Sequence, residues 1–217
     1  MVTLRHLFKP RRQSVAEEIA NSISHGVGLV CALAFAPVLI AVASQKESVW
    51  LLVGCCIFAA AVIILYLAST LYHALPHRAA KRILQIFDHS AIFLLIAGSY
   101  TPFTLGVLRG TWGWTLFGIV WGLAVLGIAL KIGLGVRHPK ISTALYLVMG
   151  WLVVLAIKPL WEQMPREGFY WLVAGGMAYT LGVFFFAAER IRYSHFIWHL
   201  FVMAGTACHY VTILFYV

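Results

Sequence analysis

The sequence contains little charge. Only 11% of its 217 residues are Asp, Glu, Lys or Arg, whereas 62% are hydrophobic, and the mean hydropathy is +0.91. Ordinary soluble domains carry about 25% charged residues, so the composition excludes a soluble protein and predicts an integral membrane protein. No polar stretch is long enough to form a separate soluble domain.

Acidic residues are especially scarce. Seven Asp and Glu stand against sixteen Lys and Arg, which gives a formal net charge of +9. Such a charge also occurs in nucleic-acid-binding proteins, but here the basic residues lie in short loops beside apolar segments. Basic residues in that position set membrane topology and contact anionic lipid headgroups. We therefore expect membrane lipids, and no nucleic acid, as partners.

Paired cysteines and a cleavable signal peptide are also missing. The four Cys lie inside apolar segments without CxxC spacing, which predicts buried free thiols. The basic N-terminal arm, residues 1–14, is followed by a hydrophobic stretch that is too long for a signal peptide. We expect this stretch to remain as a transmembrane helix.

Seven apolar segments are long enough to cross a bilayer, which requires roughly 20 residues in a helix. Their short connections make neighbouring segments antiparallel. The sequence therefore predicts an all-α membrane protein, with a seven-transmembrane helix bundle over residues 15–217. The segments are Ile19–Ala43, Val49–Tyr72, Ile83–Leu108, Trp112–Leu130, Ser142–Leu160, Phe169–Ala188 and His195–Val217.

The distribution of Lys and Arg predicts the orientation of the bundle. Four lie in the arm, three at each of the second and fourth connections, and two at the sixth, which is twelve of the sixteen. Basic residues accumulate in cytoplasmic loops. The N-terminus is therefore expected in the cytoplasm and the C-terminus outside.

Three histidines and the only aspartate fall at the same end of the expected bundle. His73 ends the second segment, Asp88 begins the third, and His195 and His199 begin the seventh. The HxxxH spacing places His195 and His199 on one helix face, where both can bind one ion. Ionisable groups at membrane depth are usually functional. We predict a Zn²⁺ site with three protein ligands and an open position, formed by His73, His195 and His199.

Asp88 is the candidate general acid and base of this site, because the HxxxH motif lacks the Glu of the HExxH proteases. It could also bind the metal directly. The alternative is a structural role, in which Asp88 forms a buried salt bridge with Lys81 or Arg82.

Ser69 lies one turn before His73 on the same helix face. Its hydroxyl could polarise a bound water or a substrate carbonyl, or it could bond back to a backbone carbonyl, as is common in membrane helices. His89 follows Asp88 but points about 100° away around the helix, so we do not count it as a ligand. His209 lies roughly 15 Å deeper than His199, where a packing role is the simpler interpretation.

The first segment begins with polar residues. Ser14 and Glu17 have the spacing of a capping box. Glu18, Asn21 and His25 follow on one face, which must meet the bundle interior or water. These three residues either orient the metal ligands or form a capping network without a part in chemistry.

Together these motifs resemble the haemolysin III proteins, the bacterial branch of the progestin and adipoQ receptor family. The resemblance covers nearly the whole chain. The motifs that carry it are Glu18-x-x-Asn21-x-x-x-His25, Ser69-x-x-x-His73, Phe87-Asp88-His89-Ser90, Ala97-Gly98-Ser99-Tyr100-Thr101-Pro102-Phe103 and Ser194-His195-x-x-x-His199.

The resemblance implies a seven-helix bundle with a cytoplasmic N-terminus in a bacterial inner (plasma) membrane. It implies zinc held by the His residues that match His73, His195 and His199, with a water between the zinc and Asp88. It also places the family beside the alkaline ceramidases, within a wider group of suspected membrane hydrolases. The chain lacks the long acidic N-terminal domain of the animal receptors, so hormone binding is not expected.

The leading interpretation is a zinc-dependent hydrolase of lipid amides or esters with a part in membrane lipid homeostasis. Zinc lowers the pKa of its water towards about 7 and polarises the carbonyl. Asp88 would transfer the proton, Ser69 would assist the oxyanion, and an acyl chain would lie among the helices. The alternatives are a non-catalytic sensor of membrane state with structural zinc and a cytolytic membrane protein.

Overall fold

The computed structural model describes residues 13–136, 139–188 and 190–217, and these contain helices and no strand. Seven spans of the described chain are long and apolar enough to cross a membrane, which confirms the predicted seven-helix membrane protein. The predicted arm lies almost wholly outside the described residues. The helices are α1 (Val15–Ser44), α2 (Val49–Ala74), α3 (Arg78–Leu105), α4 (Thr111–Leu134), α5 (Pro139–Trp151), the 3₁₀ turn η2 (Leu152–Ala156), α6 (Ile157–Gln163), α7 (Arg166–Ala187) and α8 (Ser194–Tyr216).

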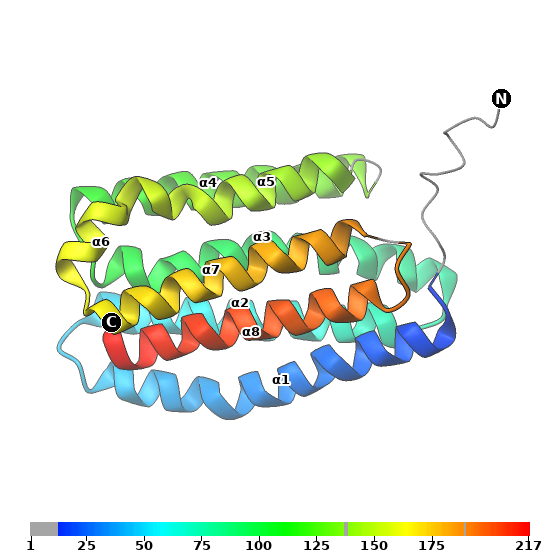
Figure 1. The fold of residues 1–217 in the computed structure, drawn as a ribbon, viewed down its shortest axis with the longest axis horizontal. Coiled ribbons are helices and arrows are strands. Elements are labelled where there is room, and N and C mark those ends of the chain that lie inside the picture. Colours follow the sequence, from blue (N-terminus) through cyan, green and yellow to red (C-terminus); the bar gives the residue numbers. More distant parts are fainter. Residues whose placement is uncertain (1–12, 137–138, 189) are drawn as a thin grey trace.

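The spans run side by side and alternate in direction (Figure 1). Helix α1 packs against α2 and α8, and α3 contacts α2, α4, α5 and α8. Large side chains around α3 are fully buried, among them Phe58 of α2, Phe93 of α3 and Met149 of α5. The alternation brings the starts of α1, α3, α5 and α8 to one end of the bundle, where α2, α4 and α7 finish. We call this the site end.

Two N-termini are joined at the site end. Helix α1 begins with the predicted capping box, in which Glu17 donates its N–H to Ser14 Oγ (3.3 Å) and accepts the Ser14 N–H at Oε2 (2.9 Å). The second carboxylate oxygen of Glu17 accepts the N–H of Tyr193 (2.9 Å), the residue before α8. Because Glu17 bonds to both segments, it fixes the start of α8 beside the start of α1.

Helix α3 differs from its predicted bounds at both ends. It begins at Arg78, before the predicted Ile83, because His77 caps it by accepting the Ala80 N–H at Nδ1 (3.4 Å). It continues through Pro102 and ends at Leu105, before the predicted Leu108. The additional turn before Ile83 is polar, so hydropathy does not detect it as part of the helix.

The fifth span is not the single helix Ser142–Leu160 that the sequence predicts. It is broken by the η2 turn between α5 and α6. The Tyr100 hydroxyl of α3 satisfies backbone groups freed at the break: it lies 2.9 Å from the Met149 carbonyl and 2.7 Å from that of Gly150, and accepts the Val153 N–H at 2.8 Å. Non-helical backbone at membrane depth requires such partners.

Candidate metal centre

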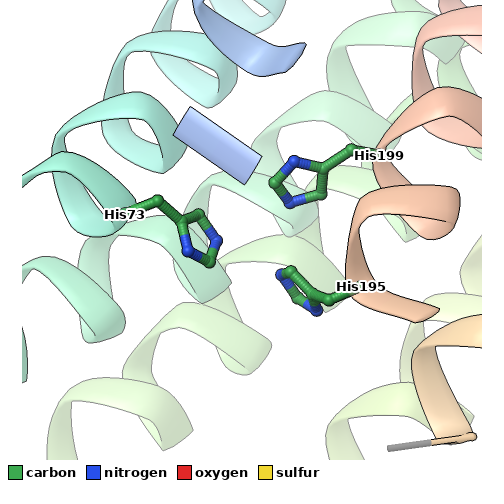
Figure 2. A group of neighbouring side chains, drawn as sticks. All are labelled: His73, His195 and His199. Atoms are coloured by element: carbon green, nitrogen blue, oxygen red, sulfur yellow. The ribbon is translucent and has the colours of Figure 1, made fainter. Parts of the chain in front are cut away.

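Three histidines meet at the site end of the bundle. His73 comes from the last turn of α2, and His195 and His199 come from the first turns of α8. Their rings point toward one another (Figure 2), with centroids 5.0 Å apart for His73 and His195, and 4.7 Å apart for His195 and His199. One ligand nitrogen from each ring lies within 4.8 Å of the others. A single metal ion could therefore bind all three.

The His73 ring is held by a carboxylate. Its Nδ1 lies 2.8 Å from Glu18 Oε2, and because a carboxylate only accepts, Nδ1 donates and Nε2 keeps a lone pair. Nε2 is buried and has no hydrogen-bond partner among the described residues. A carboxylate behind a histidine is the usual support of a metal ligand, since it fixes the tautomer and raises the basicity of the ring.

The His199 ring is held by the backbone of α1. Its Nδ1 lies 3.2 Å from the carbonyl of Asn21 and 3.0 Å from Ser24 Oγ. A carbonyl only accepts, so this network assigns the proton to Nδ1 and a lone pair to Nε2. The ring of His25 stacks on that of His199 at 3.5 Å with an angle of 6°. The orientation of His199 is thus set by both hydrogen bonding and packing.

These donors fit a zinc ion. The hydrogen bonds leave His73 and His199 with a lone pair on Nε2, and the His73 nitrogen is otherwise an orphaned buried polar atom. Three neutral imidazoles without a thiolate are the ligand set of several catalytic zinc sites, although copper, iron and nickel also accept imidazole. The three side chains could therefore hold a metal ion as its protein ligands.

Asp88 and Ser69 line the same cavity as His195 and His199, and Asp88 is close enough to His73 to interact with it electrostatically. Asp88 is buried, with 6% of its surface exposed, and the side chain of Ser69 is next to its carboxylate. The structural alternatives from the sequence are not realised in the described residues. Asp88 forms no ion pair, since Lys81 binds Glu18 instead (2.7 Å), and the Ser69 hydroxyl does not bond back to the backbone.

A cavity of about 160 Å³ extends from this cluster into the bundle. Asp88, His195 and His199 line it at the site end, and Leu108, Leu160 and Phe169 line it at the other. On α3 the lining of the cavity extends from Asp88 to Phe103, a rise of roughly 22 Å along an α-helix. Most of its wall is apolar. An apolar wall with ionisable groups at one end favours the hydrocarbon part of an amphipathic ligand, with its polar group at the site end.

The polar side chains at the start of α1 contact the candidate ligands His73 and His199, in addition to capping the helix. Glu18 binds His73, the Asn21 carbonyl binds His199, and His25 stacks on His199. Sequence reasoning missed Ser24, although it lies three residues after Asn21 on the same side of the helix. It also missed Lys81 as the ion-pair partner of Glu18, because nothing in the local sequence of α3 signals a contact with α1.

His209 lies apart from the three ligands. It lines the deeper part of the cavity, its ring is 5.4 Å from that of Tyr179, and the Leu172 backbone is close to it. Helix α7 makes room for the imidazole at Gly175, where a Cβ atom would collide with the ring. His209 therefore packs between α7 and α8 and is not part of the metal centre.

Comparison with known proteins shows the family of the chain. The haemolysin-III-related family model matches residues 13–210. The chain belongs to the haemolysin III family. Hemolysin-3 of Bacillus cereus is 46% identical over 205 residues, which cover 94% of each protein. The Hemolysin-3 homolog of Bacillus subtilis is 46% identical over 203 residues, or 94% of this chain and 95% of the relative.

A more distant relative occurs in animals. The human monocyte to macrophage differentiation factor is 27% identical over 207 residues, which cover 91% of this chain and 83% of that protein. The haemolysin III chain described here thus shares nearly its whole length with relatives in both bacteria and animals. The family membership and the seven apolar spans together show a multi-pass membrane protein.

Proposed function

We propose that this protein is a zinc-dependent hydrolase of lipid amides or esters. The observation that carries the proposal is the end of the apolar cavity, where three histidines with inward-facing nitrogens lie beside a buried carboxylate. Catalytic zinc sites use three protein ligands and keep a position open, whereas structural zinc sites are closed by four. The three-histidine set therefore favours catalysis over a structural role.

His73, His195 and His199 would hold the zinc ion, with Glu18 and the Asn21 carbonyl orienting two of them. When bound, zinc in such a site lowers the pKa of a water and polarises a carbonyl oxygen. The apolar length of the cavity would bind the acyl chain and place its carbonyl at the site end, where the buried surroundings exclude bulk water.

Asp88 and Ser69 would perform the proton and charge steps. The Asp88 carboxylate would accept a proton from the attacking water and pass it to the leaving amine or alcohol. The Ser69 hydroxyl would donate a hydrogen bond to the carbonyl oxygen as negative charge develops on it. Both side chains line the cavity next to each other, so one reacting carbonyl could contact both.

The proposed setting is the plasma (inner) membrane of a bacterium, where such an enzyme would act in lipid homeostasis. The excess of Lys and Arg at the site end supports a cytoplasmic N-terminus. The metal centre would then lie near the cytoplasmic leaflet and would act on lipids that enter from it.

Metal analysis and a hydrolysis screen test the proposal. Purified protein is expected to contain about one zinc per chain, and His195→Ala and His199→Ala should each abolish zinc retention. His77→Asn is the matched control, because it removes an exposed imidazole and leaves a residue that can cap α3. Full zinc in the double mutant would refute the metal centre.

The second arm measures turnover of fluorescent lipid amides and esters, with and without a chelator. Hydrolysis that is lost with the chelator and restored by zinc supports the enzyme. Stoichiometric zinc without turnover across a broad lipid panel would contradict hydrolysis and favour a sensor of membrane state.

A further inference from the structure

A second polar pair lies next to the metal centre and takes no part in it. His89 of α3 lines the same cavity as Asp88. Its Nδ1 is 3.4 Å from Nζ of Lys131, which is in the last turn of α4. This distance is at the long end of the hydrogen-bond range. Lys131 is buried, with only 2% of its surface exposed, and the described residues offer it no carboxylate. A buried ammonium without an anion is costly, so this position calls for an explanation.

The contact with Lys131 sets the chemistry of the His89 ring. An ammonium group only donates hydrogen bonds, so Nδ1 of His89 accepts. A neutral imidazole that accepts at Nδ1 carries its proton on Nε2. No described group forms a hydrogen bond with Nε2 of His89. The ring therefore offers an unused N–H donor, polarised by the positive charge behind it.

The backbone at His89 is also fixed. The Tyr146 hydroxyl of α5 donates to the His89 carbonyl at 2.7 Å. The ring of Phe186 is near both sites, with centroids 6.4 Å from His89 and 6.0 Å from His195. The donor therefore lines the same cavity as His195 and His199.

We infer that His89 and Lys131 form a binding subsite for the carboxylate of a long-chain acid, the product that hydrolysis of a lipid amide or ester releases. His89 contacts the carboxylate through Nε2–H. Lys131 is a positioning residue that fixes the tautomer of His89 and supplies the compensating charge. A charge-assisted hydrogen bond of this kind is about twice as strong as a neutral one. The inference rests on the lipid ligand of the proposed function but not on the metal.

Binding to metal-free protein tests the subsite. Chelator-treated protein in nanodiscs is titrated with palmitate and, separately, with hexadecanol, each in competition with a fluorescent acyl probe at alkaline pH. The two probes share a chain length and differ in their head group. Wild type is expected to bind palmitate more tightly than hexadecanol. Lys131→Met should weaken palmitate binding by about tenfold or more and leave hexadecanol unchanged.

Conservative variants separate the roles of the two residues. Lys131→Arg keeps the charge and should retain most of the preference for palmitate. His89→Gln keeps an N–H donor and should lose less than His89→Phe, which has none. Hexadecanol binding reports in each case whether the cavity is still folded.

Three results would overturn the inference. Equal weakening of palmitate and hexadecanol by Lys131→Met would show a structural role only. An unchanged preference in both Lys131→Met and His89→Phe would remove the subsite. A palmitate preference that appears only in zinc-loaded protein would place the carboxylate on the three histidines, which contradicts the subsite but supports the proposed function. Conversely, if protein purified without a chelator also contains no zinc, a Lys131-dependent preference would keep the subsite while the proposed function is rejected.

Discussion

Glu18 of α1 and His73 of α2 share a hydrogen bond of 2.8 Å between Oε2 and Nδ1. The other oxygen of the same carboxylate lies 2.7 Å from Nζ of Lys81, in the first turn of α3. One acidic side chain therefore joins three helices at the site end, and it presents the free nitrogen of His73 to the other two histidines. This relationship makes the polar start of α1 a part of the candidate metal centre.

Zinc affinity is expected to depend on Glu18. Glu18→Ala should weaken zinc binding by roughly 10- to 100-fold, because loss of a ligand's hydrogen-bond partner frees its tautomer and ring orientation. Glu18→Gln should weaken it less, since the amide oxygen can still accept from Nδ1. The measurement is zinc occupancy during titration with a competing chelator.

A matched control distinguishes this effect from a general loss of negative charge. Glu162→Gln neutralises an exposed acidic residue whose nearest basic group, Lys158, is 4.0 Å away, and it should leave zinc affinity unchanged. If Glu18→Ala bound zinc with the same affinity as the control variant, the Glu18 carboxylate would not contribute to zinc binding.

The break in the fifth span is expected to depend on Tyr100. Tyr100→Phe removes the hydroxyl that bonds to two carbonyls and one N–H at the break, and each unsatisfied buried group costs about 1–3 kcal/mol. The variant should unfold at a lower temperature in detergent. Tyr170→Phe, at an exposed tyrosine of α7, is the control. Equal unfolding temperatures for the two variants would mean that the break does not rely on Tyr100.

The meeting of the three histidines could be predicted because topology alone requires it. Seven antiparallel spans bring the end of the second, the start of the third and the start of the seventh to one end, and HxxxH fixes the shared face of His195 and His199. The depth of each histidine in the membrane, and the end of the bundle at which it lies, follow from counting residues along the spans. The separation of His209 from the cluster follows in the same way from the ten residues between it and His199.

The contacts between helices could not be predicted from the sequence. Whether Glu18 reaches His73, or Ser24 reaches His199, depends on the rotation of α1 about its axis, and hydropathy does not determine that angle. Lys131 shows the same limit: the sequence counts it among the three basic residues of the fourth connection, whereas its side chain is buried against His89. The η2 break depends on Tyr100, about 50 residues away in the chain.

The orientation of the bundle remains a prediction. Twelve of sixteen Lys and Arg belong to the predicted cytoplasmic side, so a reporter fused after Val217 should be located outside the cytoplasm. Alkaline phosphatase and green fluorescent protein fusions give opposite signals and serve as controls for each other. Fluorescence without phosphatase activity would show that the orientation is opposite to the predicted one. The candidate metal centre would then lie near the outer leaflet.

Asp88 separates catalysis from a structural role. If Asp88 is a general base that contacts the metal only through water, Asp88→Asn should leave zinc nearly in place, because Asn can still hydrogen-bond that water. Hydrolysis should fall by roughly 10²- to 10⁴-fold, the range typical of lost acid–base catalysis. Zinc content and turnover of a fluorescent ceramide-like amide are measured together, with Glu47→Gln, at an exposed loop position, as the control. Loss of zinc in Asp88→Asn would make Asp88 a direct ligand, and unchanged turnover with zinc in place would remove it from the chemistry.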